Sequence, residues 1–163
     1  MIDQARLKEL LHYDPETGIF TSRVNRGCWT PGKRVGGKRK DGYRTIRIDY
    51  KDYKEHRLAW LYAYGRWPEN DLDHVLGDEA DNRIERLREA LRVQNNANSK
   101  RSKNNRSGFK GVTLAPRCND RWRARIAKGG QQISLGTFGS PEEAHIAYCE
   151  AALRLFGEFA RPD

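Results

Sequence analysis

Asp73, His74 and Asn95 carry the residue types of a one-metal site. Asp73 and His74 are adjacent, so on a strand their side chains point to opposite faces and can take separate tasks. The carboxylate can hold a metal ion, while a neutral imidazole can accept a proton from water. An amide oxygen from Asn95 would add to the oxygen ligands that magnesium prefers. These residues predict a general base beside one hard divalent cation.

A strand, a loop and a helix are needed to bring these side chains together. Trp67-Pro68 predicts the start of an extended segment that delivers Leu72-Asp73-His74. A polar turn follows at residues 77–82. Apolar residues at helical spacing then predict a helix over residues 84–95, whose end would carry Asn95 back to the Asp-His pair. On spacing alone the motif is weak, because an exposed polar turn often contains the same residue types.

The composition favours two small cores over one large core. The chain has 163 residues, 37% of them hydrophobic, and a mean hydropathy of −0.93. No apolar run is long enough to cross a membrane, and the first residues are polar, so we expect a cytoplasmic protein. Cys28, Cys118 and Cys149 lie far apart without a Cys-x-x-Cys pair. We therefore expect free thiols and no zinc knuckle.

The positive charge is concentrated after the predicted site. The formal net charge is +9, and residues 99–135 contain ten basic side chains against one acid, Asp120. The ten are Lys100, Arg101, Lys103, Arg106, Lys110, Arg117, Arg121, Arg123, Arg125 and Lys128. A basic block of this kind indicates a polyanionic partner, most simply a nucleic acid. The alternative is a solvated basic face, but the block alternates with aromatic and turn residues.

The chain divides at a basic linker. Residues 100–107 lack any large apolar side chain and predict a flexible connection between a first domain, 1–99, and a second domain, 108–163. In the first domain the expected elements are helices at 2–11 and 55–64 and strands at 19–21 and 43–48. Both domains mix helices with strands, so the expected fold class is α+β.

The second domain predicts a small sheet covered by one helix. Strands are expected at 109–114, 121–126 and 132–136, and a helix is expected to begin after Ser140 and to end at Gly157. A single helix covers only one face of such a sheet. The other face would carry Arg123 and Arg125, which could enter a DNA major groove.

The first domain resembles the HNH homing-type endonucleases of phages and mobile elements. The motifs that carry the resemblance are His56-Arg57-Leu58-Ala59-Trp60, Trp67-Pro68, Asp73-His74 with Gly77-Asp78 and Asp81-Asn82-Arg83, Leu87-Arg88-Glu89-Ala90, and Gln94-Asn95 with Asn98. Tyr13-Asp14-Pro15 with Thr17-Gly18 is similar to the usual start of such chains. The resemblance implies a ββα-metal fold, a divalent metal such as Mg²⁺ or Mn²⁺, and double-stranded DNA as substrate in a bacterial or phage-infected cell.

The second domain resembles the plant ethylene-response-factor (APETALA-type) DNA-binding domain. The matching residues are Gly108-Phe109-Lys110-Gly111-Val112, Trp122-Arg123-Ala124-Arg125-Ile126, Leu135-Gly136 with Phe138, and Pro141-Glu142-Glu143-Ala144 with Ala147-Tyr148. The resemblance implies a DNA-facing sheet surface with Lys110, Thr113, Arg123, Arg125, Gln132 and Ser134. Lys100, Arg101, Lys103 and Arg106 are expected to contact DNA from the linker. A monomer is expected, with a dimer as the alternative.

By position, the HNH resemblance makes Asp73 and Asn95 metal ligands and His74 the general base. The family has an asparagine where Arg86 stands, and that amide holds the base-bearing loop in shape. Arginine has no acceptor and cannot take this role, so Asn82 is the candidate that could support the loop instead. His56 is expected to be structural or a phosphate contact.

Three functions remain open from the sequence. The first is a metal-dependent DNA endonuclease positioned by its C-terminal domain. The second is a DNA-binding protein whose nuclease fold is slow or inactive, because Arg86 replaces the motif asparagine. The third, an RNA-binding or structural protein, is disfavoured because the A-form major groove is too narrow for a sheet to read.

Overall fold

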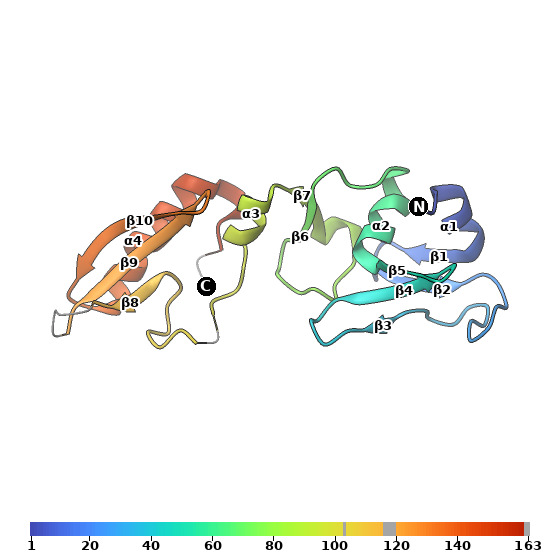
Figure 1. Ribbon diagram of the computed structural model, residues 1–163, viewed down its shortest axis with the longest axis horizontal. Helices are drawn as coiled ribbons and strands as arrows, with labels where there is room; N and C mark the ends of the chain where they lie inside the picture. Colours follow the sequence, from blue (N-terminus) through green and yellow to red (C-terminus); the bar gives the residue numbers. More distant parts are fainter. Residues whose placement is uncertain (103, 116–119, 162–163) are drawn as a thin grey trace. The chain divides into compact units, whose positions relative to one another are not determined.

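The computed structural model describes residues 1–102, 104–115 and 120–161 (Figure 1). By compactness the chain separates into unit 1, Met1–Ala90, and unit 2, Leu91–Asp163. This division falls earlier than the linker predicted at 100–107. The ammonium of Lys110 gives a physical reason, because it donates to the carbonyls of Ala97 and Ser99 and so ties this segment to the second unit.

Unit 1 consists of three small antiparallel sheets and two α-helices. Its elements are α1 Gln4–Leu10, β1 Leu11–Asp14, β2 Ile19–Ser22, β3 Gly37–Lys38, β4 Arg44–Ile48, β5 Lys51–Lys54, α2 Glu55–Tyr64, β6 Asp71–His74, the 3₁₀ turn η1 Ile84–Arg86 and β7 Leu87–Ala90. The pairings are β1 with β2, β3 with β4 with β5, and β6 with β7. The strand expected at 43–48 is confirmed as β4, in which Ile46 and Ile48 are buried and Arg47 is exposed.

One hydrophobic core holds unit 1 together, built around the fully buried Phe20, Ile46 and Leu58. The turn between β1 and β2 packs against the loop that follows β6. Gly18 has φ of +71°, and a Cβ there would come within 2.5 Å of the backbone nitrogen of Arg83. The hydroxyl of Tyr13 also donates to the carbonyl of Asn82 at 2.7 Å. The N-terminal hairpin therefore fixes the loop that joins β6 to η1.

The helix predicted over residues 84–95 is wrong. Only η1 and then the extended strand β7 occupy residues 84–90, and the helix α3 covers Arg92–Ala97. The side chains of Leu87 and Ala90 are buried, whereas that of Leu91 is 57% exposed, so the apolar residues do not form one helical stripe. Pairing with β6 supplies the backbone hydrogen bonds of this segment instead, and tertiary pairing overrides the local helical pattern.

Unit 2 contains the predicted three-stranded sheet packed on one helix. Its elements are α3 Arg92–Ala97, β8 Val112–Leu114, β9 Trp122–Lys128, β10 Gln131–Phe138, α4 Pro141–Phe156 and the 3₁₀ turn η2 Gly157–Phe159. The sheet is antiparallel in the order β10-β9-β8, and α4 covers one of its faces (Figure 1). The fold class is α+β, as predicted.

Helix α4 begins as the sequence indicates. Ser140 caps it by accepting a hydrogen bond from the backbone nitrogen of Glu143 at 3.2 Å, and Pro141 occupies its first turn. The Glu143 carboxylate reaches back to the backbone nitrogen of Gly139, one residue before the cap. Gly111, with φ of +75°, leaves space that the Tyr148 ring fills. Small residues thus let the helix and the sheet approach closely.

No helix among the described residues has both the length and the apolar character needed to span a membrane.

Candidate functional site

The β6–β7 hairpin positions Asp73 and His74. Asp73 pairs with Arg88 across the two strands and His74 pairs with Leu87, so the two functional side chains leave opposite faces. Both residues are buried, with 3% and 5% of their surface exposed. The carboxylate of Asp73 accepts a hydrogen bond from Nε of Arg88 at 2.9 Å, and Nη2 of Arg88 lies 2.9 Å from the same oxygen. Arg88 therefore fixes the orientation of this carboxylate.

His74 lies in an aromatic cluster. Its ring centroid is 5.1 Å from that of His56, edge to face, and 5.9 Å from that of Tyr43. Burial lowers the pKa of His74 below its ordinary value, although a side-chain hydrogen bond with Asn82 and the nearby acids Glu79 and Asp73 act in the opposite direction. The net effect favours a neutral imidazole at neutral pH, which is the form that can accept a proton.

His56 is a buried structural neighbour of this imidazole. Burial, together with the positive charge of His74 when protonated and of Lys54, lowers the pKa of His56 to about 3. Only 4% of its surface is exposed. A neutral His56 thus packs against the rings of Tyr43 and His74 without adding charge. This agrees with a structural role for His56, one of the two roles expected from the sequence.

A buried network holds Asn82 beside His74. Glu55, which is fully buried, accepts hydrogen bonds from Arg44 Nε at 3.1 Å and from Asn82 Nδ2 at 3.1 Å. Burial raises the pKa of Glu55, while Arg44 counteracts the shift. Tyr13 fixes the carbonyl of the same asparagine. Asn82 therefore has the contacts of a residue that supports the loop of His74.

Arg86 contributes to this loop through its backbone. Its carbonyl accepts a hydrogen bond from the backbone nitrogen of Val75 at 2.9 Å, which closes the strand pair next to His74. Its guanidinium lies 3.2 Å from the carboxylate of Glu85, the preceding residue. The side chain of Arg86 thus pairs with the adjacent residue. The resemblance implies an asparagine amide at this position.

Asn95 lies on α3, which belongs to unit 2. The structure brings together Asp73, His74 and Asn82 within unit 1, and a role for Asn95 as a metal ligand stays a prediction. Among the described residues, no three His, Cys, Asp or Glu side chains form a cluster that could hold a metal. The donor set still fits magnesium, because that ion is usually held by one or two carboxylates, with water and substrate phosphate completing its shell.

One face of the sheet in unit 2 carries five of the six residues predicted for a DNA-facing sheet surface. Thr113 pairs with Arg123, and Arg125 pairs with Ser134, so these four side chains share one face. Arg125 Nη1 donates to Gln132 Oε1 at 3.3 Å. A shallow hollow of about 210 Å³ lies there, lined by Asn105, Gly111, Val112, Thr113, Arg125 and Gln132. The face presents guanidinium and amide groups side by side.

A DNA contact by Lys110 stays a prediction. Lys110 precedes β8, and its ammonium donates to the carbonyls of Ala97, Ser99 and Arg161. These hydrogen bonds hold three backbone segments of unit 2 together. Lys100, Arg101 and Arg106 are exposed, as a phosphate contact requires. Lys103 lies outside the described residues.

Sequence reasoning missed Arg88, Tyr43 and Thr137. Reading residues 87–90 as a strand would have placed Arg88 opposite Asp73, and a periodicity of two was the available signal. Thr137 pairs with Arg123 because the register of β10 shifts between Ser134 and Gly136. Simple alternation along the strand could not reveal that bulge.

Two protein families match separate parts of this chain. The HNH endonuclease family matches residues 53–97, and the AP2 domain matches residues 107–158. Protein 3.8 of Escherichia phage T7 is 30% identical over 113 residues, which cover 69% of this chain and 92% of the phage protein. No solved structure matches.

Plant transcription factors also match. An AP2-like ethylene-responsive transcription factor of Oryza sativa subsp. japonica is 28% identical over 145 residues, and one of Arabidopsis thaliana is 27% identical over 145 residues. These matches cover 85% of this chain but only 22% and 26% of the plant proteins. The nuclease-like and AP2 domains together indicate DNA as the partner. The chain belongs to the HNH endonuclease family and carries an AP2 domain C-terminal to its nuclease-like domain.

Proposed function

We propose that the protein is a metal-dependent DNA endonuclease that hydrolyses phosphodiester bonds and is positioned on DNA by its AP2 domain. The observation that carries this proposal is the β6–β7 hairpin, which holds a buried imidazole of lowered pKa next to a carboxylate paired with Arg88. The order β6, β7, α3 is also the order of strands and helix in a ββα-metal motif.

His74 acts as the general base. Its neutral imidazole takes a proton from the attacking water, and Asn82 keeps the loop of this residue in place. Asp73 would hold the metal, and Arg88 restrains the carboxylate so that its second oxygen keeps one orientation. Asn95 remains the predicted second ligand. A bound Mg²⁺ or Mn²⁺ would stabilise the negative charge that develops on the phosphate and on the leaving oxygen.

The exposed sheet face of unit 2 supports the proposal that this domain binds DNA. Arg123 and Arg125 leave the same face of β9, and arginine side chains both hold phosphates and read guanine edges. Thr113, Gln132 and Ser134 add neutral hydrogen-bonding groups to that face. The proposed role of the AP2 domain is thus to concentrate and orient the nuclease on double-stranded DNA.

A second candidate is a DNA-binding protein whose nuclease fold does not turn over. The pairing of Arg86 with Glu85 favours it, because the side chain at the motif asparagine position makes no amide contact to the loop. Binding of DNA would then be the whole function, with the β6–β7 hairpin retained as structure.

Incubation of the intact protein with supercoiled plasmid tests the two candidates. We expect nicked or linear plasmid with Mg²⁺ or Mn²⁺, no conversion in EDTA, and a loss of at least a hundredfold in rate for His74→Ala, as removal of a general base typically causes. His145→Ala is the matched control, because that histidine lies on α4 and should not change the rate. Equal conversion by wild type and His74→Ala would reveal a contaminating nuclease, and no conversion by wild type would contradict the endonuclease proposal.

A further inference from the structure

A hollow in unit 1 lies away from the β6–β7 hairpin, where neither family resemblance assigns a function. Its volume is about 290 Å³. The turn at residues 26–29 forms one wall, and the end of the β4–β5 hairpin forms the other. The residues that line it are Arg26, Gly27, Cys28, Trp29, Arg47, Asp49 and Tyr50.

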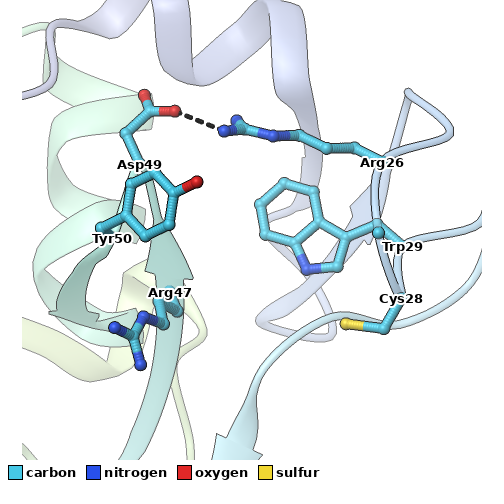
Figure 2. A pocket seen from close by; sticks show the side chains of 7 residues that line it. Arg26, Cys28, Trp29, Arg47, Asp49 and Tyr50 are labelled. Atoms are coloured by element: carbon cyan, nitrogen blue, oxygen red, sulfur yellow. Dashed lines mark hydrogen bonds and ion pairs between the residues drawn. The ribbon is translucent and has the colours of Figure 1, made fainter.

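Two aromatic side chains stand on its opposite walls (Figure 2). Trp29 is partly buried against the core of unit 1, and its backbone exchanges two hydrogen bonds with Arg26, at 2.9 and 3.1 Å. This ring is therefore held in place. Tyr50 is 91% exposed, although a tyrosine ring is costly to leave in water.

The backbone that presents Tyr50 is strained. Asp49 and Tyr50 form the turn between β4 and β5, with φ of +47° and +63°. Glycine and asparagine are the residues that such a turn prefers, and the left-handed conformation costs a residue with a Cβ about 1–2 kcal/mol. An exposed aromatic ring in a strained turn suggests that the ring is there for a ligand.

Arginines surround the aromatic walls. Arg26 Nη2 contacts Asp49 Oδ1 at 2.7 Å and links the two walls on one side, while Arg47 lies on the other side (Figure 2). A second hollow of about 370 Å³ shares Cys28, Trp29 and Arg47 with the first. Its other lining residues are Arg34, Val35, Gly36, Gly37, Thr45 and one acid, Asp52. The second hollow therefore places the guanidinium groups of Arg34 and Arg47 next to the aromatic cleft.

We propose that these two hollows bind one unstacked nucleotide. The base enters between Trp29 and Tyr50, because aromatic side chains stack on the faces of nucleobases. The phosphate lies in the neighbouring hollow against Arg34 and Arg47, since guanidinium groups match phosphate geometry. The chemistry is the same for a free nucleotide and for an unpaired nucleotide within a strand.

The size and shape of the cleft exclude duplex DNA as its occupant. A volume of 290 Å³ lies at the lower limit of small-molecule sites, roughly 300–1,000 Å³. A base within a duplex has both faces covered by its neighbours, so it cannot also stack on Trp29 and Tyr50. The site thus binds a part of the nucleic acid that the sheet of the AP2 domain does not bind. This inference does not depend on cleavage by His74.

A binding experiment without metal separates this site from the AP2 sheet. The full chain with Arg123→Ala and Arg125→Ala is titrated into a fluorescently labelled oligothymidylate, and anisotropy gives the affinity. We expect Tyr50→Asn to weaken binding by about tenfold and Tyr50→Phe to retain it. Asn suits the positive φ of this turn, so an unchanged melting temperature confirms that the variant folds. Tyr64→Ala is the control, because Tyr64 is another exposed tyrosine of unit 1.

Competition and crosslinking complete the test. Displacement by dTMP at concentrations where inorganic phosphate fails identifies a site for free nucleotides, and displacement only by unlabelled oligothymidylate identifies a strand. With 5-iodouracil in the oligonucleotide, we expect photo-crosslinks on Trp29 or Tyr50. The proposal is overturned if phosphate competes as well as dTMP, if Tyr50→Asn binds like wild type, or if crosslinks fall only within residues 112–138.

Discussion

Arg88 and Asp73 form a buried ion pair across the β6–β7 hairpin, with both guanidinium contacts at 2.9 Å to one carboxylate oxygen. Their side chains are only 18% and 4% exposed. An ionised carboxylate at this depth needs a partner, because an isolated charge is costly to bury. Arg88 therefore stabilises Asp73, the proposed metal ligand. Both of its contacts are with Oδ2, so the pairing also fixes the orientation of the carboxylate.

Replacing Arg88 by alanine should destabilise the protein and impair metal-dependent cleavage. Loss of one partner of a buried pair costs about 3–5 kcal/mol, and the partial exposure of Arg88 favours the lower end. Chemical denaturation measures the free energy of unfolding, and plasmid cleavage as a function of Mg²⁺ concentration measures the effect on the site. We expect a higher Mg²⁺ requirement in addition to lower stability.

Arg66→Ala is the matched control for this change. Arg66 pairs with Glu89, the neighbour of Arg88 on β7, but its side chain is 48% exposed. Exposed ion pairs contribute little to stability. A loss of stability for Arg66→Ala as large as that for Arg88→Ala would show that burial of the Asp73 pair is not the cause.

Replacing Arg86 by asparagine should raise the cleavage rate. The backbone contact with Val75 does not depend on the side chain, so folding should be unchanged. An amide at this position can add one hydrogen bond to the loop of His74, and one such bond is worth about 1 kcal/mol, or roughly fivefold in rate. Single-turnover plasmid cleavage measures the difference. Glu85→Gln, which removes the partner of Arg86 alone, tests whether freeing the arginine is enough; an identical gain in that variant would contradict the amide explanation.

The sequence predicted the sheet and helix of unit 2 better than it predicted the hairpin of unit 1. Ser140, Pro141 and the alternation of buried Ala124 and Ile126 with Arg123 and Arg125 are local signals, and the structure follows them. Residues 84–90 have a helical pattern but pair with β6, and pairing partners distant in the sequence leave no local signal. The role of Arg88 depends on that pairing, so it could not be assigned.

Replacing Arg123 and Arg125 by alanine should weaken binding to duplex DNA. Each lost base-reading contact costs about 1–3 kcal/mol, and each lost phosphate contact reduces the dependence of affinity on salt. Anisotropy titrations on duplex DNA at several salt concentrations, without metal, measure both effects. Arg154→Ala is the control, because Arg154 lies on α4, which covers the other face of the sheet. Equal losses for Arg154→Ala and for the double variant would indicate nonspecific attraction by charge.

Acid should destabilise unit 1 through His56. The pKa of His56 is about 3 in the folded protein and about 6.5 in the unfolded chain, so between these values the unfolded state binds more protons. The contribution of this histidine to stability is therefore complete above about pH 6.5 and is lost as the pH falls towards 3. Denaturation at a series of pH values measures it, and His56→Gln should flatten the slope in this range. His12→Gln is the control, since His12 is exposed on β1; a slope that stays the same in His56→Gln would mean that other groups cause the acid sensitivity.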